Sequence, residues 1–96
     1  MHVVRATLVR KEPRQSDEQD VARLIDALWA HTTDHDALEH VHGRPTRDGV
    51  DLVLFFRDRP DADPCRTTAE LIDRLCRGSS SAHKLFEPCG EYQTLH

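Results

Sequence analysis

One apolar stretch, Gly49-Val-Asp-Leu-Val-Leu-Phe-Phe56, constrains the fold of this chain more than any other segment. It is the only long apolar run in the sequence, and it lies between the turn signal Arg47-Asp48-Gly49 and a charged, proline-containing segment that starts at Arg57. A short run of Val, Leu and Phe between such breakers is typical of a buried strand. Alternation predicts a wholly apolar, core-facing set that consists of Val50, Leu52, Leu54 and Phe56. The opposite set is half apolar and consists of Asp51, Val53, Phe55 and Arg57.

The size and charge of the chain limit what surrounds this strand. A chain of 96 residues has room for one hydrophobic core, so we expect a single domain over residues 1–96. The net charge is −4 and there is no basic stripe, which argues against a nucleic-acid partner. No apolar run approaches the roughly 20 residues of a membrane span, and the first residues lack the basic-then-apolar layout of a signal peptide. We therefore expect no membrane association and a cytoplasmic location, where widely spaced cysteines stay reduced.

The first half of the chain has clear strand and helix periodicity. Residues 2–10 alternate and contain β-branched side chains, which predicts a strand. Ser16 and Gln19 have the spacing of a capping box at the start of a helix over 17–31. The apolar stripe of this helix recurs at helical spacing and consists of Val21, Leu24, Ile25 and Leu28. Trp29 borders the stripe and could line a cleft with His31, although a tryptophan in this position usually packs.

The second half of the chain supplies the remaining elements. Residues 38–44 predict a short strand, and turn-forming residues over 45–49 connect it to the central strand, so that these two strands are antiparallel neighbours. Thr67 and Glu70 form a second capping-box pattern, which predicts a helix over 67–77 that ends at Gly78. The segment 82–96 is interpreted as an edge strand or a flexible tail, because Pro88 is tolerated only at an edge.

The order strand, helix, strand, strand, helix and edge strand predicts an α+β sandwich, an antiparallel sheet with two helices on one face. The first and third strands would then be central, which agrees with their apolar character. This βαββα(β) arrangement resembles the ferredoxin-like superfold and its dimeric α+β barrel members. The resemblance covers most of the chain and is architectural. Because the sequence has no specific family motif, no catalytic residue is carried over from it.

A histidine-rich segment is the first candidate site. His31, His35, His40 and His42 lie close together in the sequence with Asp34 and Asp36, and such side chains bind zinc, nickel or copper. His40 and His42 are two residues apart on a predicted strand and so project from the same face. The alternative is that these are exposed polar residues at a helix end and on an edge strand, since the sequence has no HExxH motif or other known ligand spacing.

The sheet face opposite the helices is the second candidate site. As a catalytic surface it would use His40 or His42 for proton transfer, with Asp51 orienting the imidazole. As a homodimer interface it would use the apolar side chains of Val3, Val9, Val53 and Phe55, and a contiguous patch of that kind favours self-association. We favour the interface.

Three functional hypotheses follow, none of which requires a cofactor. The first is a small homodimeric accessory module that recognises a protein partner or a small molecule, which suits a chain without a catalytic signature. The second, by analogy with dimeric α+β barrels, is a cofactor-independent oxygenase or cyclase of secondary metabolism. The third is a metal-binding protein that uses the histidines between His31 and His42. An enclosed pocket between the sheet and the helices would favour the enzyme, whereas a filled core with an apolar outer face would favour the module.

Overall fold

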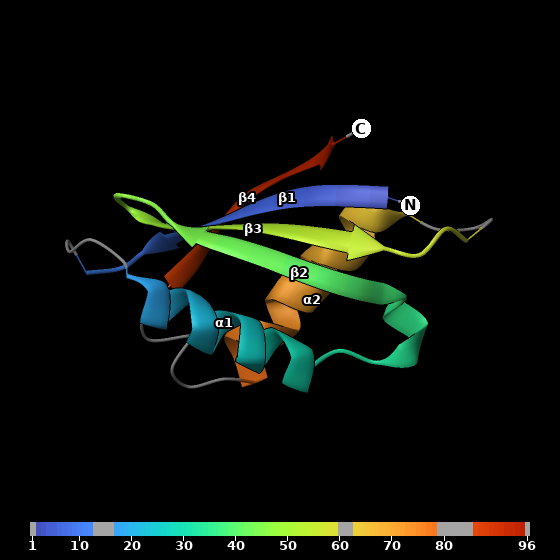
Figure 1. Cartoon of the computed structure of the whole chain (residues 1–96), viewed down its shortest axis with the longest axis horizontal. Helices are drawn as coiled ribbons and strands as arrows, with labels where there is room; N and C mark the ends of the chain where they lie inside the picture. The colour runs from blue at the N-terminus through green and yellow to red at the C-terminus, as the bar shows by residue number, and fades with distance from the viewer. Residues whose placement is uncertain (1, 13–16, 60–62, 79–85, 96) are drawn as a thin grey trace.

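The chain combines strands and helices, with two consecutive strands in its middle, in a computed structural model that describes residues 2–12, 17–59, 63–78 and 86–95 (Figure 1). The elements are β1 (His2–Arg10), α1 (Glu18–Ala30), the 3₁₀ turn η1 (Asp34–Asp36), β2 (Leu38–Pro45), β3 (Gly49–Phe56), α2 (Pro64–Gly78) and β4 (Phe86–Leu95). The predicted strands at 2–10, 38–44 and 49–57 are therefore confirmed to within a residue. The predicted edge strand is present over 86–95.

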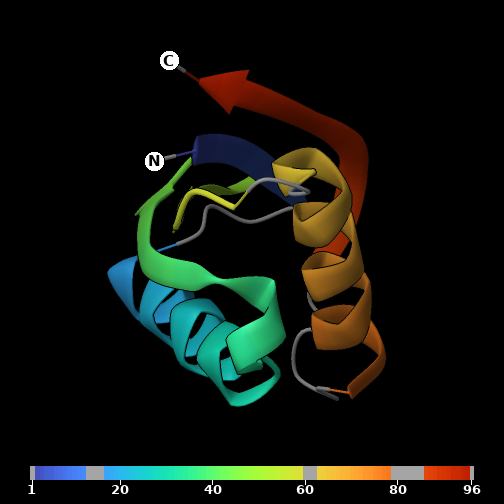
Figure 2. The same ribbon diagram turned by 90° about the vertical axis from the view of Figure 1, so that its right-hand side faces the viewer.

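The strands form one antiparallel sheet in the order β2-β3-β1-β4. As expected from their apolar sequences, β1 and β3 are the central strands. Both helices lie on the same side of the sheet, where α1 packs against β2 and α2 packs against β4 and β1 (Figures 1 and 2). The molecule is thus a mixed α+β sandwich with one antiparallel sheet and two helices.

The start of α1 differs slightly from the prediction. Its N-cap is Asp17, whose side chain accepts a hydrogen bond from the backbone N–H of Asp20 over 2.9 Å, and the Asp20 carboxylate accepts one from Asp17 N–H over 3.1 Å. This reciprocal pair is a capping box one residue later than the predicted pair, whose Ser16 lies outside the described residues.

The capping box predicted for α2 is wrong, because the helix begins a full turn earlier. Pro64 is the first helical residue, a position that proline favours since its missing N–H is not needed there. The side chain of Asp63 accepts a hydrogen bond from Arg66 N–H over 3.2 Å. Thr68 lies inside the helix, where its hydroxyl donates to the carbonyl of Pro64 over 2.7 Å.

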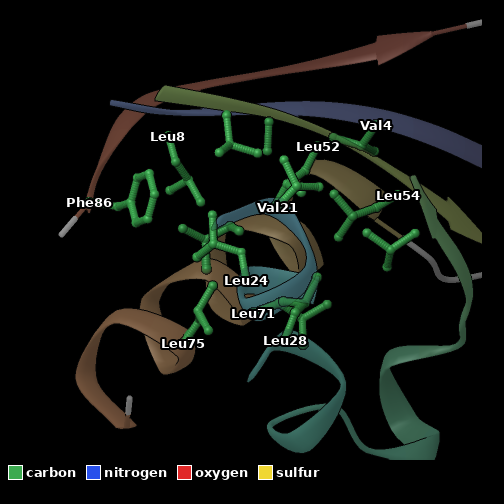
Figure 3. Close-up of a cluster of buried hydrophobic side chains, with 14 of the residues drawn as sticks. Val4, Leu8, Val21, Leu24, Leu28, Leu52, Leu54, Leu71, Leu75 and Phe86 are labelled. Atoms are coloured by element: carbon green, nitrogen blue, oxygen red, sulfur yellow. The ribbon is translucent and has the colours of Figure 1, made fainter. Parts of the chain in front are cut away.

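The core lies in the layer between the sheet and the two helices (Figure 3). The predicted core residues Leu24, Leu28, Leu52, Leu54, Leu71 and Leu75 are all buried there, each exposing 3% of its surface or less. Ile25 is the exception and is half-buried at the margin of the core. At the far end of the core, Phe86 of β4 packs beside the guanidinium group of Arg10, which forms a buried ion pair with Asp20 over 2.8 Å.

The entry into β3 depends on a glycine. A Cβ atom at Gly49 would lie 1.9 Å from the carbonyl oxygen of Leu8, so that only glycine allows β3 to approach β1 this closely. Backbone hydrogen bonds fix the turn on both sides, from Arg10 N–H to Asp48 O over 2.7 Å and from Thr46 N–H to Gly49 O over 2.8 Å.

Candidate functional site on the open sheet face

The sheet face opposite the helices presents its side chains in rows that cross the strands. Paired residues of antiparallel strands point to the same side, so the strand register defines these rows. The first row crosses all four strands and consists of His40, Phe55, Val3 and Leu95. The second row is mixed and consists of His42, Val53, Arg5 and Gln93. The third row is polar and consists of Arg44, Asp51 and Thr7.

A buried carboxylate lies in the polar row. Asp51 is only 6% exposed although it points away from the core. Its carboxylate accepts hydrogen bonds from Arg5 Nη2 and from Thr7 Oγ1, each over 2.8 Å, and Arg44 Nη2 lies 3.5 Å away. Burial alone would raise the pKa of Asp51, but the bonds from Arg5 and Thr7 and the charges of both arginines outweigh it, so this pKa lies below its ordinary value. Asp51 is therefore ionised, and its carboxylate holds the side chain of Arg5 by a hydrogen bond.

In the catalytic hypothesis, Asp51 would orient the imidazole of His40 or His42. Within the described residues, the hydrogen-bond partners of Asp51 are Arg5 and Thr7. His40 instead lies against Phe55, with 5.5 Å between the ring centroids and an interplanar angle of 47°. His42 is exposed in the mixed row. A low carboxylate pKa also makes Asp51 a poor proton acceptor near neutral pH.

The four candidate metal ligands are distributed over separate elements. His31 caps the C-terminus of α1, and its carbonyl accepts a hydrogen bond from Arg74 Nη1 over 2.8 Å. His35 lies in η1, because α1 ends before it and the two histidines do not share a helical turn. His40 and His42 project from β2 on the open face. Within the described part of the chain, no group of three or more His, Cys, Asp or Glu side chains is arranged to hold a metal ion.

The candidate interface residues are divided by the polar row. Val3 and Phe55 are directly paired, and Val53 lies in the next row. All three side chains are half-buried. Val9 pairs with Gly49 at the opposite end of the face, beyond Thr7 and Asp51, so the expected contiguous patch of four residues does not form. Leu95 takes the place of Val9, because β4 brings it directly beside Val3.

The sequence pattern placed Asp51 on the open face but did not identify Arg5 and Thr7 as its partners. Alternation assigns a residue to a face, whereas the pairing of Thr7 with Asp51 also requires the register of β1 against β3. Leu95 was missed for the same reason, since the register of β4 shifts between its contacts with Ala6 and Leu8.

Because comparisons with known proteins found no match, the function is inferred from the geometry of the site. No protein-family model matches this chain, and neither the curated proteins nor the solved structures contain a significant match. Among the described residues, neither helix combines the length and the apolar character that a membrane-spanning helix needs.

Proposed function

We propose that this chain is a homodimeric binding module, in which the open sheet face of one copy binds the same face of a second copy. The observation that carries the proposal is the first row, in which His40, Phe55, Val3 and Leu95 cross the entire sheet on the face without a helix. Aromatic and aliphatic side chains in such a row gain most by contact with another apolar surface.

The topology supports this proposal. A ferredoxin-like fold is expected to have β1 and β3 in the centre of the sheet, the strand order β2-β3-β1-β4, and a helix in each crossover between strands. This chain has all three features. We assign the chain to that architecture and, within it, to the dimeric α+β barrel kind. Proteins of that kind associate through their sheets, which suits a sheet with helices on one side only.

The charge pattern of the face favours a second copy of the chain as its occupant. A two-fold axis that runs parallel to the strands between β1 and β3 would place Phe55 against the partner's Val3, in an isologous packing of aligned sheets. The same axis would place Asp51 against the partner's Thr7. In this arrangement like charges do not oppose each other. Within each copy, the guanidinium groups of Arg5 and Arg44 are already directed at Asp51.

The packing of the described core residues supports a binding module over an enzyme with a pocket among them. Between the sheet and the helices, Leu28, Leu52, Leu71, Ile72 and Leu75 are fully buried and pack against one another. A dimeric-barrel enzyme would need a reaction cavity among these core residues, reached by a histidine or a pair of polar groups. The described histidines lie outside this layer.

The proposal is tested by sedimentation velocity on the intact chain and on two charge-insertion variants. The unmodified protein should be a dimer at micromolar concentration. Phe55→Glu should be a monomer with an unchanged circular dichroism spectrum, because Phe55 points away from the buried Leu54. Ala22→Glu, which adds the same charge on the exposed side of α1, should remain a dimer. A monomeric unmodified protein, or a Phe55→Glu variant that is still dimeric, would refute the proposal.

A further inference from the structure

A cavity lies at the end of α1, outside the rows of the sheet face. Its volume is about 300 Å³, at the lower end of the range for small-molecule sites. Residues from the end of α1, the η1 turn, the start of β2 and the end of β3 form its walls, and they include Trp29, Thr32, Asp34, Leu38, Glu39 and Arg57. The turn that brings them together passes through Ala37, whose carbonyl accepts a hydrogen bond from Arg57 N–H over 2.9 Å.

Trp29 gives this cavity an aromatic wall. The side chain borders the apolar stripe of α1, where a tryptophan normally packs, yet it remains 40% exposed. Leu38 is half-buried at the core margin and adds an apolar surface beside it. An accessible indole ring in a concave site is the strongest aromatic partner for a cation, because its π-face carries negative charge.

The charged groups around the cavity favour a cation. Asp34 and Glu39 supply two exposed carboxylates and Arg57 supplies one exposed guanidinium group, so these side chains carry a net negative charge. None of the three side chains forms a hydrogen bond or ion pair within the residues that the structure describes. By contrast Asp36, in the same turn as Asp34, is fully engaged with Arg74 and Thr33. The carboxylates of Asp34 and Glu39 are therefore available to a ligand.

We propose that this cavity binds a small organic cation, an alkylammonium or guanidinium group on a short apolar body. The indole of Trp29 would contact the cation, Leu38 would contact its apolar body, and Asp34 and Glu39 would balance its charge. Arg57 would oppose binding and so limit the affinity. The proposal goes beyond dimer formation and does not depend on it, since the cavity shares no residue with the first row of the open face.

The single tryptophan makes the test direct, because the fluorescence of Trp29 then reports on this cavity without interference from another tryptophan. The intact protein is titrated with choline and with agmatine, up to about 10 mM because exposed charged groups support only modest affinity. Choline is compared with 3,3-dimethylbutan-1-ol, a neutral molecule of the same shape. Both cations should change the emission saturably, and choline should bind at least about tenfold more tightly than the neutral isostere.

Charge variants distinguish this site from general surface attraction. Asp34→Asn combined with Glu39→Gln should weaken choline binding about tenfold, and Arg57→Gln should strengthen it roughly threefold, the effects expected of partly exposed charges. Asp26→Asn removes an exposed carboxylate of α1 outside the cavity and should leave the affinity unchanged. Thermal melting verifies that each variant is folded.

A lysine or arginine side chain of another protein has the same chemistry as a free cation. A short unstructured peptide with one arginine, titrated beside agmatine, separates the two sources. Equal affinity indicates a site for the free cation, whereas much tighter peptide binding would contradict a small-molecule ligand. The proposal is also refuted by a titration without saturation, by equal affinity for the neutral isostere, or by an equal loss in Asp26→Asn.

Discussion

The ion pair between Asp36 and Arg74 ties α2 to the η1 turn, and replacing Asp36 with Asn should weaken this connection. The carboxylate accepts hydrogen bonds from Arg74 Nη2 over 2.8 Å and Nη1 over 3.3 Å. It also accepts bonds from the Thr33 backbone N–H over 2.8 Å and the Thr33 hydroxyl over 3.1 Å. Asparagine keeps the shape and one acceptor oxygen, so the change removes the charge with little effect on packing.

The size of the effect follows from the unequal burial of the two partners. The side chain of Asp36 is 8% exposed and that of Arg74 is 38% exposed. Breaking a fully buried pair costs about 3–5 kcal/mol, and an exposed pair contributes about 0–1 kcal/mol. Because Arg74 can be rehydrated when its partner is lost, we expect Asp36→Asn to lower the free energy of unfolding by about 2 kcal/mol. For a domain of this size that corresponds to a decrease in melting temperature of roughly 10 °C.

The contribution of Asp36 should also depend on pH. Burial alone would raise its pKa, but the hydrogen bonds from Arg74 and Thr33 and the charge of Arg74 outweigh burial and lower the pKa in the folded state. A group whose pKa is lowered by folding stabilises the protein above its unfolded-state pKa, which is about 3.9 for Asp. The difference in stability between the unmodified protein and Asp36→Asn should therefore be full above about pH 5 and decrease as pH falls through the folded-state pKa.

Urea unfolding followed by circular dichroism, at one fixed protein concentration, measures this difference between pH 7 and pH 2.5 or so. Asp73→Asn is the matched control, because Asp73 forms an exposed pair with Arg77 over 3.2 Å within the same helix. That variant should change stability by less than about 0.5 kcal/mol. Equal costs for the two variants, or a cost of Asp36→Asn that does not change with pH, would refute the assigned role of the Asp36 pair.

Two further predictions concern the sheet. Leu54→Ala should lower the free energy of unfolding by about 2–5 kcal/mol, because Leu54 is fully buried in the core, and a urea midpoint close to that of the unmodified protein would contradict this. Gly49→Ala should destabilise the protein more than Ala22→Gly, an exposed change in α1 that costs about 1 kcal/mol, because the added Cβ would overlap the carbonyl of Leu8; thermal melting of both variants provides the comparison.

Sequence periodicity was sufficient for the elements and the class of the fold, because each strand and helix has its own apolar pattern. Val50, Leu52 and Leu54 alternate onto the core, and this single pattern fixes the orientation of the central strand. Helix starts were less accurate, since Thr67 fits a capping box as well as a position inside a helix. The choice between them was made by Pro64 and Asp63, which supply a better helix start one turn earlier.

The candidate sites were harder to predict because they depend on register and on turns. The pairing of Thr7 with Asp51 joins two residues that are 44 positions apart in the sequence, and no local pattern gives that alignment. The cavity beside Trp29 depends on Ala37, which adopts a left-handed conformation with φ of 57°. A non-glycine residue seldom adopts this conformation, so the sequence indicated only that a polar connection follows α1.

The proposed dimer and the proposed cation site can fail separately, because they use different parts of the fold. Phe55 lies in the row that crosses the open face, whereas Trp29 lies at the end of α1 on the helix side of the sheet. The two surfaces approach each other at β2, where Glu39 of the cavity precedes His40 of the row. A monomeric Phe55→Glu variant that binds choline with unchanged affinity would show that one copy forms the whole cavity. A loss of binding in that variant would contradict the independence of the two sites.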